Sequence, residues 1–366
     1  MTFDQEEVKY FVALSQEPKI GARTFLKLLR RFHKLKNVWR AEMVDFIRND
    51  IPEDIGRLII ALLKKVDPDK EMEKIDQLGI RVITIKDQNY PKLLKEIPDP
   101  PSVLYIKGEF KPEDELAIAV IGARKYTSYG IRACEDITKS LAQKGMTIVS
   151  GLALGIDSFA HQAALSVKKG RTIGVLACGL DRVYPVSNRK LAEIISTRGA
   201  IISEFPLGTP PMKYNFPVRN RIIAGLSLGV LVVEASLRSG SFLTAHSALE
   251  YNREIFAVPG SIYSEKSTGP NNLIKMGAKL VSSADDILTE LNIESKSEKI
   301  EAQKIIPETK EEDILLKLIP KDNPIHIDKL AKLSKLEIAK LNQTLILMEM
   351  KGKIRNLGAN QYVIVS

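Results

Sequence analysis

The sequence predicts an α/β protein built on a doubly wound, mostly parallel sheet, with a helical region before the sheet and a small helical module after it. Two observations predict the sheet. Between residues 116 and 291, short apolar runs alternate with helical patterns, as in successive βαβ units. The runs are continuously apolar, which indicates strands covered by helices on both faces. A change of pattern on either side predicts the flanking domains.

These changes of pattern set the expected domain boundaries. We expect a helical domain, similar to a SAM or helix-hairpin-helix domain, over residues 1–65 and an extended Rossmann-like domain over 66–291, with its core at 116–291. A linker is expected at 292–310, because its residues are polar and show no apolar period, and a winged helix at 311–366.

The first 65 residues have apolar side chains at spacings of three and four, the helical period. The predicted helices cover 6–14, 24–32, 41–47 and 54–63. Gly21 lies between the first two helices, among the basic residues Lys19, Arg23, Lys27, Arg30 and Arg31. This arrangement is typical of a helix-hairpin-helix, whose turn offers N–H groups to a phosphate. A small helical bundle with a solvated basic face explains it equally well.

Strands are expected from residue 80 onward. Three of them, 81–85, 90–94 and 101–108, are separated by prolines and lead into the central sheet. The six central strands are predicted at 117–122, 146–151, 172–179, 199–204, 229–234 and 254–260. Ligands of such sheets bind outside the carboxyl ends of the strands. Five loops are expected at that edge: Gly122 to Lys125, Ser150 to Gly155, Cys178 to Asp181, Ser203 to Phe205 and Ser239 to Ser241.

The segment 210–227 follows the fourth central strand and has the sequence P-P-M-K-Y-N-F-P-V-R-N-R-I-I-A-G-L-S. It carries Lys213, Arg219 and Arg221 beside Tyr214 and Phe216, and it contains no carboxylate. Its prolines predict an irregular loop up to a helix that begins at Arg219. Because a helix N-terminus already favours negative charge, we expect these arginines to need an outside partner, such as phosphate. The alternative is that they pair with acids elsewhere and that Phe216 belongs to the core.

Small residues in the other loops suit the same chemistry. Gly151 and Gly155 would let the backbone approach a ligand closely, and Asp157 is placed to cap its helix. The run from Ser239 through Gly240 to Ser241 can form a nest of N–H groups before a helix that begins at Thr244. Plain turn geometry is the alternative for each loop. His161, alone on an apolar helix, is expected to be a core residue rather than a catalyst.

The net charge of +9 and the isoelectric point of about 9.2 point to nucleic acid as a partner. Residues 1–115 carry 21 basic and 21 acidic side chains, and 292–366 carry 13 and 11. Residues 116–291 carry 20 basic and 13 acidic side chains, a surplus of seven. The contact is therefore expected in the central domain.

Several classes of protein are not expected. No stretch of about eighteen uninterrupted apolar residues is present, and the acidic start M-T-F-D-Q-E-E is unlike a signal peptide, so we expect a cytoplasmic protein without membrane contact. Cys134 and Cys178 are isolated in a chain with four histidines, which predicts reduced core residues and neither a disulfide nor a metal site. The sequence has no G-x-G-x-x-G with a distal acid and no P-loop, so no cofactor is expected. No nucleophile, base and orienting group are placed together, so we expect no enzyme.

The motifs, taken in order, resemble the DNA-processing protein A family, DprA or Smf. They are V-I-G-A-R-K-Y-T-S-Y-G, I-V-S-G-L-A-L-G-I-D-S-F-A-H, G-L-D-R-V-Y-P, S-E-F-P, F-P-V-R-N-R-I-I-A-G-L-S, S-G-S-F-L-T-A and V-P-G-S-I, preceded by Y-P-K-L-L-K-E-I-P-D-P-P-S-V-L-Y-I-K-G. The resemblance implies a homodimer that binds single-stranded DNA, shields incoming strands during natural transformation and helps load RecA recombinase. It places DNA contacts on Arg124, Lys213 and Phe216. One departure is Ala123, where the family often has serine.

A single-stranded DNA site is therefore predicted at the carboxyl edge of the sheet. Lys213 and Arg124 would bind phosphates and Phe216 would stack on a base, while Arg219 and Arg221 would add charge or hold the loop. The predicted set also includes Lys125, Ser150, Gly151, Gly155, Asn220, Ser239 and Gly240.

Two other functions stay open. One is an enzyme resembling the LOG phosphoribohydrolases, which cleave nucleoside monophosphates with a P-G-G-x-G-T-x-x-E loop. This chain has R-S-G-S-F-L-T-A instead, without the carboxylate. The other is a recombinase adaptor with incidental DNA affinity.

The C-terminal region predicts a winged helix. Helical patterns cover 312–319, 325–333 and 338–350, and a hairpin with a glycine turn follows at 353–365. The third helix has few basic side chains for reading a major groove. A protein-contact or autoregulatory role is therefore weighed equally with DNA binding.

Overall fold

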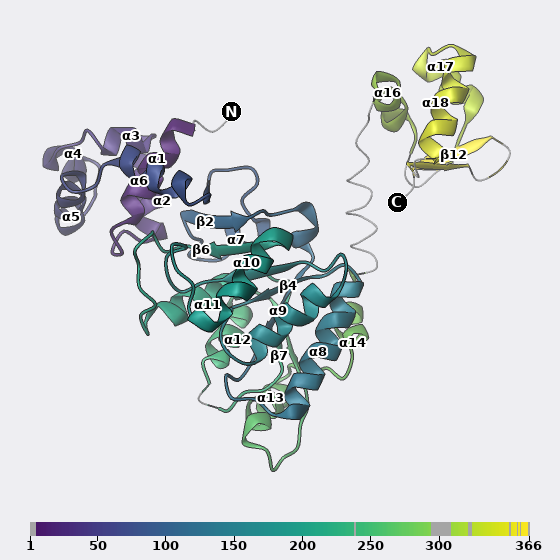
Figure 1. Cartoon of the computed structure of the whole chain (residues 1–366). Coiled ribbons are helices and arrows are strands. Elements are labelled where there is room, and N and C mark those ends of the chain that lie inside the picture. The colour runs from purple at the N-terminus through teal and green to yellow at the C-terminus, as the bar shows by residue number, and fades with distance from the viewer. Residues whose placement is uncertain are drawn as a thin grey trace. The chain divides into compact units, whose positions relative to one another are not determined.

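The structure is a computed structural model (Figure 1), and it describes residues 5–237, 239–293, 309–320, 324–350, 353–356, 358 and 360–364. The chain divides into two units, Met1–Ile287 and Leu288–Ser366. The first contains the N-terminal helices and a nine-stranded sheet, and the second contains a three-stranded sheet with helices. The finer domain boundaries expected from the sequence stay predictions. The expected linker at 292–310 lies largely outside the described residues.

The N-terminal part of the first unit is helical. Its helices are α1 (Gln5–Ser15), α2 (Ala22–Phe32), α3 (Leu35–Val38), α4 (Met43–Arg48), α5 (Glu53–Leu63) and α6 (Pro68–Gln77). The four predicted helices are confirmed, and the sequence pattern missed α3 and α6. A start signal does precede α6, because Asp67 caps it by accepting from the N–H groups of Asp69 and Lys70 and Pro68 is its first residue.

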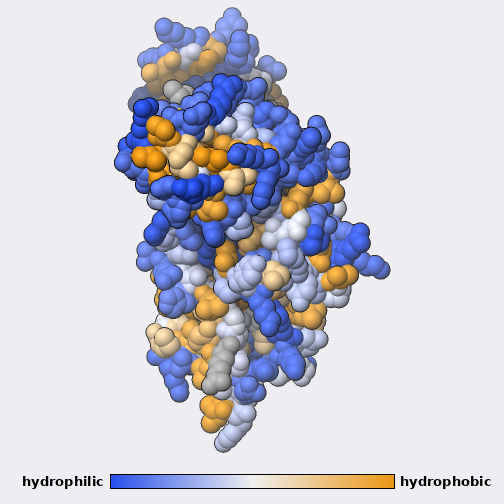
Figure 2. All heavy atoms as spheres, turned by 90° about the vertical axis from the view of Figure 1, so that its left-hand side faces the viewer, coloured by the Kyte–Doolittle hydropathy of each residue, from blue (hydrophilic) through white to orange (hydrophobic). Residues whose placement is uncertain are grey.

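Part of the basic face near Gly21 is paired within the chain. Arg31 forms an ion pair with Asp50 at 2.5 Å, and Lys27 donates to the carbonyl oxygen of the same residue. A phosphate-binding role of this turn stays a prediction. On the face that carries α4 and α5, Figure 2 shows apolar side chains gathered between hydrophilic ones; Val44 and Ile47 of α4 are 53% and 55% exposed. Such a patch is typical of a protein contact surface.

The sheet of the first unit has the order β1-β2-β6-β5-β4-β3-β7-β8-β9. The strands are β1 (Arg81–Thr84), β2 (Val103–Gly108), β3 (Ala117–Ile121), β4 (Thr147–Ser150), β5 (Thr172–Val175), β6 (Ala200–Ser203), β7 (Gly229–Val232), β8 (Glu254–Ala257) and β9 (Lys279–Leu280). β3 to β9 are parallel, and β1 and β2 join at one edge as antiparallel strands. Every residue from β3 to β7 within the strands is buried. The predicted doubly wound, mostly parallel sheet is confirmed.

Helices connect the parallel strands in two groups. The helices are α8 (Ser128–Gln143), α9 (Ile156–Ser166), α10 (Arg189–Arg198), α11 (Asn215–Gly225), α12 (Ser241–Glu250), α13 (Thr268–Lys275) and α14 (Ala284–Glu290). α8, α9 and α10 pack side by side, α11 packs on α12, and β5 contacts both α9 and α11. The chain moves from β3 outward to β6 and then returns to β7 on the other side of β3. The strand order therefore reverses between β3 and β7.

Three expected boundaries are wrong. Residues 90–94 are not a strand, because α7 (Lys92–Lys95) begins directly after Pro91, which is suited to a helix start. α11 begins at Asn215, earlier than expected, and includes Pro217 in its first turn. Proline is tolerated there because the first N–H groups of a helix have no partner within the helix. α12 begins at Ser241 rather than at Thr244.

The second unit is the predicted winged helix. It contains α16 (Lys310–Leu318), β10 (Ile325–His326), α17 (Ile327–Ser334), α18 (Ile338–Met350), β11 (Ile354–Asn356) and β12 (Gln361–Ile364). The sheet is antiparallel with the order β10-β12-β11. The short strand β10 was not predicted. The core of this unit includes Leu315, Leu330, Leu341, Leu345, Met348 and Tyr362.

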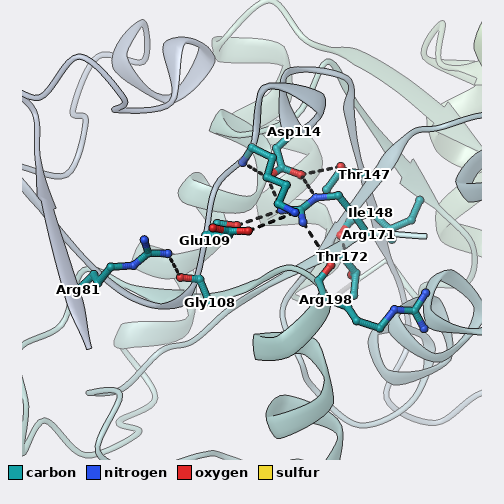
Figure 3. Close-up of polar contacts among 10 residues, drawn as sticks. Arg81, Gly108, Glu109, Asp114, Thr147, Ile148, Arg171, Thr172 and Arg198 are labelled. Carbon is teal, nitrogen blue, oxygen red and sulfur yellow. Dashed lines mark hydrogen bonds and ion pairs between the residues drawn. The ribbon is translucent and has the colours of Figure 1, made fainter. Parts of the chain in front are cut away.

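A network of paired polar groups lies at the amino ends of the parallel strands (Figure 3). Arg171, directly before β5, donates from Nε and Nη2 to the two carboxylate oxygens of Asp114 at 2.9 and 2.8 Å. Arg171 also donates to the carbonyl oxygens of Glu109 and Arg198, and Thr147 donates its hydroxyl to Asp114 at 2.7 Å. We call these five residues the amino-edge network. The side chains of Arg171 and Asp114 are only 14% and 6% exposed.

Among the helices that the structure describes, none has both the length and the apolar character needed to cross a bilayer.

Candidate nucleic-acid interface

A cavity of about 330 Å³ lies at the carboxyl ends of β3 and β7, where the strand order reverses. Doubly wound sheets bind ligands at this place, because the loops after the two strands diverge and leave a crevice. Five segments line the cavity: the loop after β3, the loop after β4 with the start of α9, α11, the loop after β7 with the start of α12, and one residue after β8. We call it the switch-point cavity. A second cavity of about 40 Å³ shares Arg124, Phe216 and Arg219 with it.

The loop after β3 is held in place by a buried carboxylate. Glu234, directly after β7, is 1% exposed and accepts from the Thr127 N–H at 3.0 Å and from its hydroxyl at 2.5 Å. Thr127 in turn caps α8 by accepting from the Gly130 N–H at 3.1 Å. A Cβ atom at Gly130 would lie 2.3 Å from the Glu234 carboxylate, so only glycine fits. Arg124 and Lys125, which precede this anchor, are both exposed.

Gly151 and Gly155 make room for the chain itself rather than for a ligand. Gly155 has a φ of +84°, and a Cβ atom there would lie 2.3 Å from the Ala123 carbonyl oxygen. A Cβ atom at Gly151 would lie 2.6 Å from the guanidinium group of Arg219. Ser150 is fully buried and donates its hydroxyl to the Val120 carbonyl oxygen at 2.7 Å. The space beside Gly151 and Gly155 is thus taken by the chain itself, and a contact of these residues or of Ser150 with DNA stays a prediction.

Arg219 is a buried residue of the cavity wall. It is 4% exposed, and its guanidinium donates to the carbonyl oxygens of Gly151 and Val175 and, through Nε, to the Asn220 side chain at 3.0 Å. Burial lowers the pKa of Arg219 to about 10, and the nearby Asp157 opposes this shift. Burial also raises the pKa of Asp157, against the charge of Arg219. Asp157 accepts from the Gly151 N–H at 3.1 Å and makes no cap on its own helix, which corrects the expected cap.

Arg221 is also paired within the chain. Its Nη2 forms an ion pair with Glu204, and its Nε lies 3.2 Å from the Asp99 carboxylate. Burial raises the pKa of Glu204 to about 7, and Arg221 opposes the shift. The expectation that Arg219 and Arg221 need a partner from outside the chain is wrong. The structure instead agrees with the alternative that they hold the loop.

Phe216 lies among cationic groups. The guanidinium carbon of Arg124 is 5.3 Å from the centre of its ring, that of Arg219 is 5.9 Å away, and the Tyr184 ring meets it edge-on at 5.9 Å. Both guanidinium distances are within the cation–π range. Phe216 is half-buried, so part of its ring is accessible at the cavity wall.

Lys213 lies just before α11 and is exposed, but it does not line either cavity. Within the part of the chain that the structure describes, neither Lys213, Lys125 nor Arg124 forms an ion pair with a carboxylate. These three residues therefore supply positive charge at this edge that the chain itself does not neutralise.

In the loop after β7, several backbone groups already form hydrogen bonds within the chain. The Ser239 N–H donates to the Ser236 carbonyl oxygen at 3.0 Å, and the Ser241 N–H donates to the Ser239 hydroxyl at 3.1 Å. The side chain of Asn220 donates to the Gly240 carbonyl oxygen at 3.3 Å. The expected nest of free N–H groups is therefore corrected, because the Ser239 and Ser241 amides already have partners. Ser239 and Gly240 still line the cavity.

Sequence reasoning missed Lys266. This half-buried residue follows β8, in the short helix η3 (Glu265–Ser267), and it lines the switch-point cavity. The loop after β8 neighbours the loop after β7 in the strand order, which was the signal that could have found it. Only the preceding V-P-G-S-I motif was singled out.

His161 and the cysteines are core residues, as predicted. His161 is fully buried, its Nδ1 lies 2.6 Å from the Thr172 hydroxyl, and burial lowers its pKa to about 3. Cys134 and Cys178 are buried and unpaired. Neither side chain lines the switch-point cavity.

These features define a class of protein. The fold is Rossmann-like, yet in place of a dinucleotide fingerprint its carboxyl edge presents hydroxyl groups, an aromatic ring and cations that have no carboxylate partner among the described residues. Such an edge suits a polyanion with flat bases.

The comparisons with known proteins identify the family. The family model for DNA recombination-mediator protein A matches residues 81–292, and that for the DprA winged helix domain matches 300–360. The chain is 39% identical over 311 residues to Protein Smf of Synechocystis sp., which covers 82% of this chain and 77% of the relative. It is 47% identical over 214 residues to DNA processing protein DprA of Bacillus subtilis, covering 58% and 72%. The chain belongs to the DNA recombination-mediator protein A family.

Two solved structures agree. DNA processing protein A of Streptococcus pneumoniae matches with a TM-score of 0.69 at 35% identity, over 79% of this chain and 99% of that one. The Helicobacter pylori protein, whose structure concerns its single-stranded DNA binding mode, matches with a TM-score of 0.53 at 33% identity, over 60% and 96%. The resemblance drawn from the sequence motifs is confirmed.

Proposed function

We propose that this protein binds single-stranded DNA at the carboxyl edge of its parallel sheet. The observation that carries this proposal is the set of exposed cations, Arg124, Lys125 and Lys213, that have no carboxylate partner among the described residues; the guanidinium carbon of Arg124 lies 5.3 Å from the centre of the half-buried Phe216 ring. Lys213 and Arg124 bind phosphates, and Phe216 stacks on a base. Of the other predicted contacts, Asn220, Ser239 and Gly240 reach the ligand from the cavity wall, while Arg219 and Arg221 hold the loop.

The preference for single strands follows from the aromatic ring. A base in a duplex has both faces stacked on its neighbours, whereas an unpaired base can leave the strand and stack on a side chain. The similarity to the Helicobacter pylori protein supports the same preference.

We also infer the cellular role that the family suggests. The protein protects incoming or processed single strands in natural transformation and recombination, and it helps load RecA recombinase on them. It acts in the cytoplasm as a homodimer. A pull-down of RecA on DNA coated with this protein, beside naked DNA, tests the loading step.

The second candidate, an enzyme that cleaves nucleoside monophosphates, has weaker support. Asp157 is the one carboxylate that lines the switch-point cavity within the described part of the chain, and it is occupied by the Gly151 N–H and the charge of Arg219. A free general acid or base is therefore not offered to a ligand. Release of free base from nucleoside monophosphates by the purified protein would support the enzymatic function and contradict our proposal.

The main test is a titration with oligo-dT and with duplex of equal length. We expect stronger binding of oligo-dT and a steep loss of affinity with salt, with a log–log slope of roughly −0.7 per phosphate neutralised. A matched control is Lys139→Ala, which removes one exposed charge from α8, away from both cavities. Equal affinity for duplex, or binding that is independent of salt, would refute the proposal.

A further inference from the structure

The switch-point cavity holds more positive charge than its own residues neutralise. Arg124, Lys125 and Lys266 line it from two different loops, after β3 and after β8. Within the described residues, none of the three forms an ion pair with a carboxylate. Three unpaired cations around one small volume repel one another, and this repulsion is relieved when an anion enters.

The one carboxylate in the wall does not cancel this charge. Asp157 is 7% exposed, and Arg219 beside it is 4% exposed, so the two buried charges offset each other. The net charge of the cavity lining therefore remains that of the three outer cations.

The shape of the cavity limits the ligand. Its volume of about 330 Å³ is at the small end of ligand pockets, which span about 300–1,000 Å³. Its deeper wall consists of Ile121, Ile223 and Thr244, which are 3%, 1% and 2% exposed. A cavity of this volume has room for one terminal group of a strand rather than for several nucleotides.

The polar groups that line the cavity determine which chemical group at the end of a strand would bind there. Hydroxyls of Ser236 and Thr244 accompany the three cations, and this set supplies donors to several oxygens at once. A terminal phosphate has three free oxygens and about −1.5 to −2 charge, whereas a phosphate within a strand carries a single charge. We propose that the switch-point cavity binds the terminal phosphate of a nucleotide, either at the phosphorylated end of a DNA strand or on a free mononucleotide.

This inference rests on the proposed function for the strand-end source, since the rest of the strand must bind along the same sheet edge. Substitution of Lys266 distinguishes binding of the strand end from binding of the rest of the strand. This residue belongs to the loop after β8, whereas Arg124 and Phe216, which line the same cavity, belong to the loop after β3 and to α11. Removal of Lys266 should therefore reduce the gain from a terminal phosphate more than it reduces binding of the rest of the strand.

The experiment compares three oligo-dT ligands of equal length in full-length protein: 5′-phosphorylated, 3′-phosphorylated, and with hydroxyls at both ends. We expect one phosphorylated end to raise affinity about tenfold, the scale of a hydrogen-bonded charge pair. Lys266→Ala should abolish this gain, Lys266→Arg should keep most of it, and Lys139→Ala should keep all of it. Affinity for the hydroxyl-ended strand should stay the same in Lys139→Ala, and in the two Lys266 variants the ratio of the affinities for phosphorylated and hydroxyl-ended strands is the quantity compared. A thermal melt of each variant that matches the parent shows that the fold is intact.

A competition arm separates the two sources of the phosphate. Displacement of the phosphorylated strand by dTMP, but not by thymidine, assigns the site to a nucleotide in either form, and failure of dTMP assigns it to the strand end. If inorganic phosphate displaces the strand as effectively as dTMP does, the proposal of a nucleotide site is wrong and the cavity is a simple anion site.

Other outcomes distinguish this inference from the proposed function. If hydroxyl-ended oligo-dT binds and neither phosphate changes its affinity, the inference fails and the proposed function stands. If no oligonucleotide binds while dTMP binds in a Lys266-dependent way, the proposed function fails and the inference stands.

Discussion

The two edges of the parallel sheet use arginine in different ways. At the amino edge, Arg171 donates to both oxygens of Asp114 and to two carbonyl oxygens, and it is 14% exposed (Figure 3). At the carboxyl edge, Arg124 is exposed and its guanidinium carbon lies 5.3 Å from the centre of the Phe216 ring. A guanidinium whose donors are satisfied inside the chain stabilises the fold, whereas one that lacks acceptors is available to a ligand.

Arg219 and Arg221 show why the motif alone is not enough to tell these uses apart. Both lie in the R-N-R motif at the ligand edge, yet their donors are taken by carbonyl oxygens and carboxylates as fully as those of Arg171. Position near a site therefore does not by itself make an arginine a ligand contact. The arginine must also have donors that no acceptor of the chain already binds.

The largest expected effect is at the amino-edge network. Arg171→Ala leaves Asp114 buried without its charged partner, so the free energy of unfolding should fall by about 3–5 kcal/mol. Urea denaturation measures the loss. The folded fraction should bind oligo-dT with parental affinity.

Arg171→Lys is the matched variant for that prediction. Lysine keeps the charge but cannot form the two parallel hydrogen bonds, so an intermediate loss of stability is expected. A stable Arg171→Ala protein with weakened DNA binding would reverse the assignment of the two edges.

At the carboxyl edge, Phe216→Ala should weaken oligo-dT binding by about 1–3 kcal/mol while leaving the salt slope unchanged, because no charge is removed. The measurement is a set of binding isotherms at several salt concentrations. Thermal melting of the variant is the control, since a fully buried Phe→Ala change costs about 3–5 kcal/mol of stability. A variant that melts far below the parent but binds normally when folded would make Phe216 a core residue.

A smaller effect is expected for single charges. Lys213→Ala or Arg124→Ala should make the salt slope shallower by about 0.7 and lower the affinity for all single-stranded sequences, because each removes one phosphate contact. Titrations from low to moderate salt give the slope. An unchanged slope in both variants would mean that other cations bind the phosphates.

The smallest effect is expected for the winged helix. Deletion of residues 306–366 should leave oligo-dT affinity nearly unchanged, because this region belongs to the second unit and its third helix is poor in basic residues. A tenfold loss, about 1.4 kcal/mol, would place part of the DNA site in that unit.

Most of the fold was predictable because apolar continuity is a strong signal. Each of the six central strands was predicted from its run of apolar residues, and their parallel direction predicted the ligand edge. The reversal of strand order, which places the cavity between β3 and β7, is known only from the structure. Short elements were not predictable: α3 and α7 have four residues each, too few to show a period.

The site was predictable by location but not residue by residue. The sequence does not tell whether Gly151 and Ser150 face a ligand or the interior. In the structure the Arg219 side chain occupies the space beside Gly151, and the Ser150 hydroxyl donates to the Val120 carbonyl oxygen. The acceptors of Arg221 come from Asp99 and Glu204, which lie 122 and 17 positions away in the chain. Pairings of that kind depend on the three-dimensional packing and leave no trace in a local motif.

The Glu234 carboxylate has a consequence for the thermodynamics of binding. It fixes the backbone next to Arg124 through Thr127 and fills the space that Gly130 leaves, so the loop is already ordered in the free protein. A ligand that arrives then restricts little more than the Arg124 side chain. Ordering one such side chain costs about 0.5–1.5 kcal/mol, much less than ordering a whole loop. The conformational entropy that would otherwise oppose association is thus lost during folding, before any strand is bound.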